Sequence, residues 1–134
     1  MGLGVYLQSS PNRNQPADDA VYVCSLDNDG YYWHLYPAFE VLHESCGQMI
    51  DLYGDALFQG DLLASLEAAL AAAHLQAVSQ PERWEFVQTA IVVGAATEVR
   101  SPVYRSVLLT LLEELQAGVA TARANGSCIL FWGD

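Results

Sequence analysis

The stretch SPVYRSVLLTLLEELQAGVATARANGSCILFW, residues 101–132, decides the fold of this chain. Ser101 and Pro102 predict the start of a helix, because serine caps free N–H groups and proline is preorganised in the first turn. Over about five turns, one face then carries apolar residues at helical spacing. These residues are Tyr104, Leu108, Leu111, Leu115, Val119 and Ala122. After the expected stop at Gly126, residues 128–132 show no polar alternation, which predicts a central strand of a sheet.

Upstream of this stretch, the sequence predicts another long helix and another strand. The helix covers residues 61–77 and opens with Asp61, whose carboxylate caps N–H groups and favours the positive end of the helix dipole. Its apolar stripe consists of Leu62, Leu66, Ala69, Leu70 and Ala73. Pro81 breaks this pattern, and we expect a strand over residues 83–93, with alternate residues on its two faces.

The N-terminal part of the chain predicts a β-hairpin. Strands are expected at residues 4–8 and 20–26, separated by an exposed, turn-rich loop at residues 9–19. The sequence Asp-Asn-Asp-Gly at residues 27–30 supplies turn chemistry, since glycine accepts a positive φ without steric cost. The aromatic residues 31–36 are then the expected returning strand.

The middle of the chain is less regular. A short helix is expected within residues 38–48, with Gly47 as its stop, and short extended pieces within residues 49–58. We therefore expect a single α+β domain over residues 1–134. Its predicted architecture is a mostly antiparallel sheet of about four or five strands, with two long helices packed on one face.

The net charge of the chain limits the kinds of molecule that it is expected to bind. The chain contains 16 Asp or Glu residues and five arginines but no lysine, and its formal net charge is −11. Such a field repels phosphate backbones and anionic lipid surfaces, so we expect neither a nucleic-acid partner nor a membrane partner. It can steer a basic protein onto the acidic surface, while solubility alone is the alternative explanation.

Cysteine usage and the first residues predict a cytoplasmic protein with reduced thiols. Cys24, Cys46 and Cys128 form an odd set, whereas a secreted disulfide scaffold favours an even one. The N-terminal residues carry no basic segment followed by a long apolar run, so a secretory signal is not expected. No stretch approaches the roughly 20 uninterrupted apolar residues of a membrane span.

Catalytic and metal-binding chemistry finds little support in the sequence. His43 and Cys46 lie three apart, but no CxxC or HxxxH motif accompanies them, and further His and Cys residues are scattered. The paired carboxylates are better explained by turns and by the solvated faces of helices, and no phosphate-binding motif exists. We therefore expect no catalytic residue, no metal and no cofactor.

The aromatic residues 31–36 are the most unusual feature of the sequence. In a strand, alternate residues of this segment share one face next to the acidic turn, an arrangement typical of protein interfaces. Ordinary packing of the sheet under a helix is the alternative. The expected partner-binding residues, including two carboxylates of a second acidic patch, are Asp27, Asp29, Tyr32, His34, Tyr36, Asp51 and Asp55. Asp27, Asp29 and Tyr32 are the expected anchors.

Two segments carry a family resemblance. The first is Asp51-Leu52-Tyr53-Gly54, followed by Phe58 and by Gly60-Asp61-Leu62-Leu63 at the start of a Leu/Ala-rich helix. The second is the last third of the chain, with its long Leu-rich helix, Asn125-Gly126 and the apolar strand that ends in Phe131-Trp132-Gly133-Asp134. Both segments resemble small acidic bacterial immunity proteins of polymorphic or contact-dependent toxin systems.

The resemblance implies a protein that binds one cognate toxin and blocks it, without catalysis of its own. It assigns no functional residue, since these families share little beyond size, acidity and location. The leading expectation is therefore a protein-binding module with a basic protein partner, most specifically a toxin-neutralising immunity protein. The alternative is a small enzyme or small-ligand-binding protein with a pocket near residues 31–36.

Overall fold

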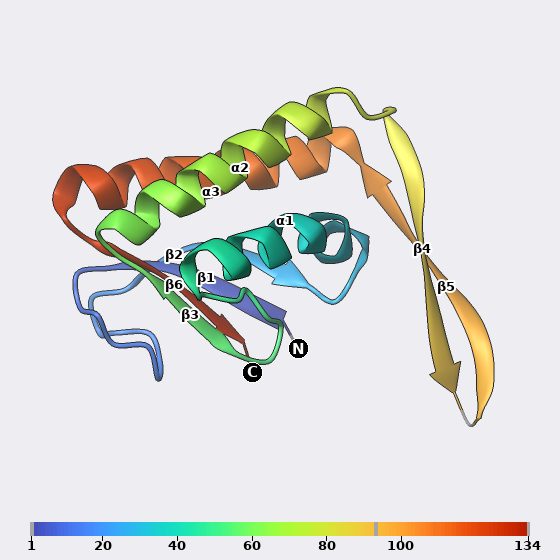
Figure 1. The fold of residues 1–134 in the computed structure, drawn as a ribbon, viewed down its shortest axis with the longest axis horizontal. Helices are drawn as coiled ribbons and strands as arrows, with labels where there is room; N and C mark the ends of the chain where they lie inside the picture. Colours follow the sequence, from blue (N-terminus) through green and yellow to red (C-terminus); the bar gives the residue numbers. More distant parts are fainter. Residues whose placement is uncertain (1, 93, 134) are drawn as a thin grey trace.

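In residues 2–92 and 94–133, which the computed structural model describes, the chain forms six strands and three helices (Figure 1). In chain order they are β1 (Gly2–Gln8), β2 (Val21–Asp27), α1 (Gly30–Cys46), β3 (Asp55–Phe58), α2 (Asp61–Val78), β4 (Arg83–Val92), β5 (Ala95–Tyr104), α3 (Arg105–Asn125) and β6 (Cys128–Gly133). The predicted α+β class with antiparallel pairing is confirmed. None of the helices in the described residues combines the length and the apolar character that a bilayer span demands.

Four strands form the main sheet, in the order β2-β1-β6-β3, and every neighbouring pair is antiparallel. Strand β6 lies between β1 and β3, which confirms the central strand predicted for residues 128–132. All three helices lie on the same side of this sheet (Figure 1). On that side, the two expected long helices, α2 and α3, are accompanied by a third helix, α1.

The main core lies between the sheet and the helices. On β1 and β6, alternate residues such as Leu3 and Phe131 are buried on this side. The helices contribute apolar stripes, which in α3 consist of Leu108, Leu112, Leu115, Val119 and Ala122. Leu112 is fully buried in this stripe, whereas Leu111, which the sequence assigns to it, is only partly buried.

The opposite face of the sheet carries a second, smaller cluster. Leu57, Cys128 and Leu130 are buried there, with Tyr6 and Trp132 packed against them. The loop predicted at residues 9–19 is held beside this face by hydrogen bonds of the buried Gln8 side chain. Its Nε2 donates to the carbonyls of Ser10 (2.8 Å) and Asn12 (2.7 Å), and its Oε1 accepts from the Ala17 N–H (3.0 Å).

The prediction of a strand at residues 31–36 is wrong, because these residues form the first half of α1. Asp29 caps this helix, and its side chain accepts a hydrogen bond from the Tyr31 N–H (3.0 Å). The buried residues Tyr32, Leu35 and Phe39 follow at helical rather than alternating spacing. Tertiary packing of this stripe overrides the strand preference of the aromatic residues. The helix continues through Pro37 and ends at Gly47, as predicted.

The prediction that α3 starts at Ser101-Pro102 is also wrong. These two residues belong to β5, which pairs with β4 over its whole described length, and the helix begins at Arg105. Pro102 is tolerated because β5 is an edge strand. The strand predicted for residues 83–93 is confirmed as β4, and its expected last residue, Val93, lies outside the described residues. We call β4 and β5 the arm, because they project from the rest of the molecule, which we call the body (Figure 1).

Candidate functional site

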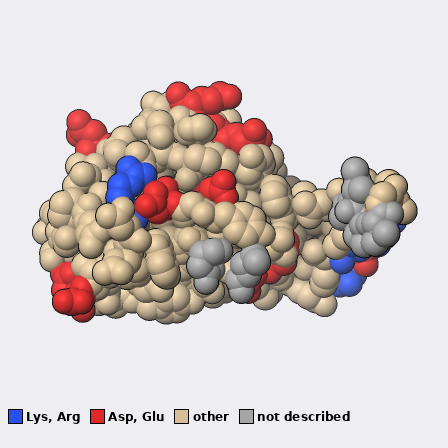
Figure 2. Space-filling model, turned by 90° about the horizontal axis from the view of Figure 1, so that it is seen from below, with Lys and Arg blue, Asp and Glu red and all other residues tan. Residues whose placement is uncertain are grey.

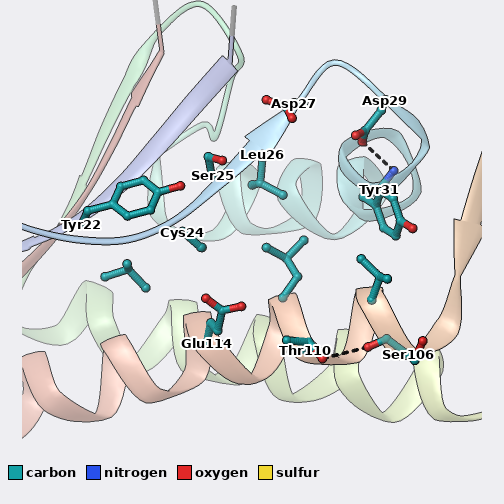
Figure 3. A pocket seen from close by; sticks show the side chains of 13 residues that line it. Tyr22, Cys24, Ser25, Leu26, Asp27, Asp29, Tyr31, Ser106, Thr110 and Glu114 are labelled. Carbon is teal, nitrogen blue, oxygen red and sulfur yellow. Dashed lines mark hydrogen bonds between the residues drawn. The ribbon is translucent and has the colours of Figure 1, made fainter.

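A groove of about 550 Å³ lies between β2 and α3 (Figure 3). Its apolar lining comes from Val23 and Leu26 on the strand, and from Val107 and Leu111 on the helix. Its polar lining consists of Ser25, Asp27, Asp29, Ser106, Thr110 and Glu114. The groove is thus an apolar channel with carboxylates on its rim.

The helix side of the groove follows from the spacing of residues in α3. Val107, Leu111 and Glu114 are four and three positions apart, which places them one above another on a single helix face. This face is distinct from the buried stripe, and the Val107 side chain remains 49% exposed. α3 therefore presents a second face, partly apolar, toward the edge of the sheet.

The strand side of the groove is an open sheet edge. β2 pairs with β1 on one side and with no other described strand on its outer side. The opposite edge, β3, is shorter, and its Leu57 N–H donates to the Gln48 side chain (3.1 Å). An unpaired strand is a template for pairing with another chain. Of the two edges, β2 is the longer and lies beside the groove.

The electrostatics of the groove are acidic. Asp29 accepts a hydrogen bond from the Tyr31 N–H at one end, while Glu114 lies on α3 (Figure 3). Burial raises the pKa of the Asp29 carboxyl, and its hydrogen bonds from α1 oppose this rise. None of the described residues that line the groove is an arginine. The groove is therefore suited to cationic groups rather than to anions.

Two of the expected partner-binding residues, Asp27 and Asp29, line this groove. Asp51 and Asp55 lie elsewhere: Asp51 accepts from the Tyr53 N–H (2.8 Å), and Asp55 pairs with Arg13 (3.3 Å). Asp55 is on β3, and two strands separate it from β2, which corresponds to about 14 Å at the usual strand spacing. The two acidic patches are thus separate.

The other three expected residues, Tyr32, His34 and Tyr36, lie on α1 and contribute to its packing. Tyr32 is buried, and its hydroxyl donates to the Ile50 carbonyl (2.8 Å). Burial raises the pKa of this hydroxyl. His34 is half-buried against Trp84 at the base of the arm, and burial lowers the pKa of its imidazole. Tyr36 packs on Tyr32 with ring centroids 6.0 Å apart. Tyr32 is therefore a core residue, as the alternative of ordinary aromatic packing predicts.

Sequence reasoning missed the groove residues of α3, above all Val107, Thr110 and Glu114. A signal was present, because Val107 is an apolar residue outside the core stripe of its helix. Likewise, Val21 and Tyr22 on β2 are large apolar residues that remain 59% and 57% exposed. No local pattern in the sequence indicates that β2 lies beside α3, because the two elements are far apart in the chain.

The thiols of Cys24 and Cys128 are poor candidates for nucleophilic chemistry. Cys24 lines the groove, but burial raises its pKa to about 12, and the nearby charge of Glu114 adds to this rise. Burial likewise raises the pKa of Cys128. Nucleophilic catalysis requires a thiolate, which these environments disfavour. Among the described residues, no three His, Cys, Asp or Glu side chains come close enough together to hold a metal ion.

Comparison with protein-family models, with curated proteins and with solved structures finds no match to this chain.

Proposed function

We propose that this chain is a protein-binding module that captures an extended, basic segment of a partner protein. The observation that carries the proposal is the open edge strand β2 beside an apolar groove with carboxylates on its rim. Adding a strand to such an edge supplies main-chain hydrogen bonds, and pockets for alternate side chains supply specificity. The seven residues of β2 offer an edge of roughly 23 Å at the usual rise per residue.

The side chains of the added strand would divide between the two faces of the sheet. Those on the helix side enter the groove, where Val23, Val107 and Leu111 favour apolar groups. Arginine or lysine at the ends of the segment would meet Asp27, Asp29 or Glu114. Partly desolvated pairs of this kind fix the register of the segment and reject acidic partners.

The charge of the body supports a basic partner at longer range. The chain carries a net charge of −11, and Figure 2 shows separate acidic groups over the face of the body seen there. Basic groups are visible at one spot on that face and on the projecting arm. A surplus of one sign over a surface raises the association rate of an oppositely charged protein.

More specifically, we propose that the partner is a bacterial toxin and that the module acts as its immunity protein in the cytoplasm. This step rests on the resemblance of residues 51–63 and of the last third of the chain to immunity proteins. It agrees with the acidity of the chain and with a site suited to binding rather than catalysis. In this role the module blocks its partner by occupying a surface that the toxin needs.

A small-ligand-binding or enzymatic role is the second candidate. The groove volume of about 550 Å³ falls within the usual range of ligand pockets, and Tyr31 from the aromatic segment contributes to its wall. An enzyme also needs a matched acid and base or an activated nucleophile. The raised pKa of Cys24 argues against that thiol as the nucleophile. Binding of another protein therefore remains the leading role.

The test begins with the protein encoded by the neighbouring open reading frame, whose binding is measured by titration calorimetry. Glu114→Arg places a cation in the groove and is expected to weaken binding roughly thirtyfold, the usual effect of losing an interface anchor. Glu113→Arg is the matched control, because it changes the same charge on the exposed adjacent residue, which does not line the groove.

Three outcomes bear on the proposal. Loss of binding in Glu114→Arg alone supports the groove as the interface. Equal binding by both variants and the parent shows that the groove is not the interface. A neighbouring frame that encodes a metabolic enzyme, with no binding between the two proteins, removes the support for the immunity role and favours the second candidate.

A further inference from the structure

The arm is a two-stranded ribbon with little support from the body. Its base packs on α1: Trp84 lies 5.1 Å from His34, measured between ring centroids, and Val103 is fully buried. Beyond the base, β5 is exposed from Ala95 to Arg100, and Val87 on β4 is 45% exposed. An isolated two-stranded ribbon is only marginally stable in water. A ribbon of ten residues per strand therefore gains stability from additional pairing.

The arm differs from the body in charge. It carries two arginines, Arg83 and Arg100, and two glutamates, Glu85 and Glu98, so its formal charge is zero. The net charge of −11 therefore belongs to the rest of the chain. A basic partner is drawn to the body, while the arm of this acidic protein is the part that two copies can bring together without strong repulsion.

The outer edge of β5 is free to pair in a defined register. The Tyr104 N–H donates to the Tyr31 hydroxyl (3.2 Å), so it points away from β4. Because successive residues of a strand alternate, and the β4–β5 register is regular, the backbone groups of Glu98 and Arg100 also point outward. Pro102 falls in the same series, where its missing N–H costs the β4–β5 ladder nothing.

We propose that two copies of this chain associate through their β5 edges, antiparallel about a two-fold axis at Val99. In this register, Glu98 of each copy lies opposite Arg100 of the other. The same two residues are those whose backbone groups point outward, so each opposed pair exchanges two hydrogen bonds. Charge and backbone geometry therefore select the same register independently.

The resulting sheet has four strands in the order β4-β5-β5-β4, with one half from each copy. Residue 95 of one copy lies opposite residue 103 of the other, so the tip of each arm reaches the base of its neighbour's arm. With five residues between Val99 and Tyr104, the two bases are roughly 33 Å apart. The acidic bodies therefore sit at opposite ends of the shared sheet, separated by several Debye lengths at physiological salt.

Pairing through β4 fits less well. On β4, Trp84 is the residue that lies midway between an arginine and a glutamate, namely Arg83 and Glu85. Trp84 packs against His34 at the base of the arm, so a two-fold axis there would bring the bodies together. A two-fold axis nearer the tip, at Gln88, leaves Glu85 opposite an uncharged residue. The β5 edge therefore gives the self-complementary arrangement.

The experiment is sedimentation equilibrium of the intact chain and of charge-reversed variants. The parent is expected to sediment as a dimer of twice the 14.6 kDa chain mass. Glu98→Arg places like charges opposite each other at both symmetric positions and is expected to weaken dimerisation about tenfold or more. The double variant Glu98→Arg/Arg100→Glu restores opposite charges at both positions and is expected to recover the dimer.

Glu82→Arg is the matched control, because it makes the same charge change on an exposed residue just before β4, whereas Glu85 itself pairs with Arg100 (3.4 Å). It is expected to leave the dimer intact. If Glu98→Arg does not fold, Glu98→Gln replaces it in the experiment. Glu98→Gln removes the charge without reversing it and should weaken the dimer to a smaller extent. Far-UV circular dichroism confirms folding of each variant.

A monomeric parent at high micromolar concentration overturns the proposal. So does a dimer that Glu98→Arg leaves unchanged, or one that Glu82→Arg weakens equally, since the contact then lies elsewhere. These results are independent of the groove, because Glu114→Arg changes a residue of the body and leaves the β5 edge unaltered.

Discussion

The body and the arm differ in what stabilises them. The body buries apolar stripes from three helices against one face of a four-stranded sheet, and its surplus negative charge stays outside that core. Beyond its base, none of the arm residues whose burial is described is buried. The arm also carries balanced charges and exposes strand edges on both sides. The body therefore has a buried core of its own, whereas the arm, a two-stranded ribbon, would gain stability by pairing with a further strand.

The largest difference is expected when one apolar side chain is shortened in each region. Leu112→Ala empties a fully buried site in the body and is expected to lower the free energy of unfolding by about 2–5 kcal/mol. Val87→Ala in the exposed part of the arm is expected to cost less than about 1 kcal/mol. Denaturant titration at low protein concentration measures both. Equal costs would show that the arm belongs to the same cooperative core as the body.

The junction between the two regions gives an intermediate effect. A Cβ at Gly30 would lie 2.7 Å from Val103 Cγ2 and 3.0 Å from Ser101 Cβ, so Gly30→Ala forces the base of the arm away from α1. Overpacking of this kind is expected to cost about 1–3 kcal/mol and to speed proteolysis within the arm.

Gly54→Ala is the control for this junction, because the nearest heavy atom to its added Cβ, in the Asp51 side chain, is an ordinary 3.6 Å away. If Gly30→Ala and Gly54→Ala match the parent in unfolding and in proteolysis, the arm is not held at its base in solution.

The smallest expected effect is a pH dependence of that same junction. Burial lowers the folded-state pKa of His34 below its ordinary value of 6.5, so the folded protein favours the neutral ring. Its contribution to stability is complete above pH 6.5 and is lost as the pH falls below 6.5 and through the folded pKa. His34→Gln should flatten this part of the stability profile, measured as the difference between variant and parent. A difference that does not change between pH 7.5 and 5 contradicts the assignment.

The long elements of the body were predictable because their local patterns agree with their tertiary surroundings. Residues 61–77 show helical periodicity, and residues 128–132 form the unbroken apolar run that a central strand requires. α2 and β6 lie where expected. The first half of α1 was not predictable in this way, because its aromatic residues, taken one by one, favour a strand. The deciding features are the cap at Asp29 and the helical spacing of Tyr32 and Leu35.

The arm and the groove were harder to predict for a different reason. Ser101-Pro102 matches a helix start locally, and only pairing with β4 makes these residues a strand. Asp27 and Asp29 were predicted as site residues, and the structure places both at the groove. Their counterparts on α3, Val107 and Glu114, come from a distant part of the chain, which a local pattern cannot bring to β2.

The position of β6 in the middle of the sheet also bears on how the molecule folds. Pairing of Leu3 with Gly133 closes a loop of almost the whole chain, and such non-local contacts slow folding. The arm is a local hairpin, and hairpins form within about 1–10 μs. Newly made chains therefore sample the hairpin, with its open edges, before the sheet of the body is complete. During that interval, the open edges of the arm are available for pairing with another chain.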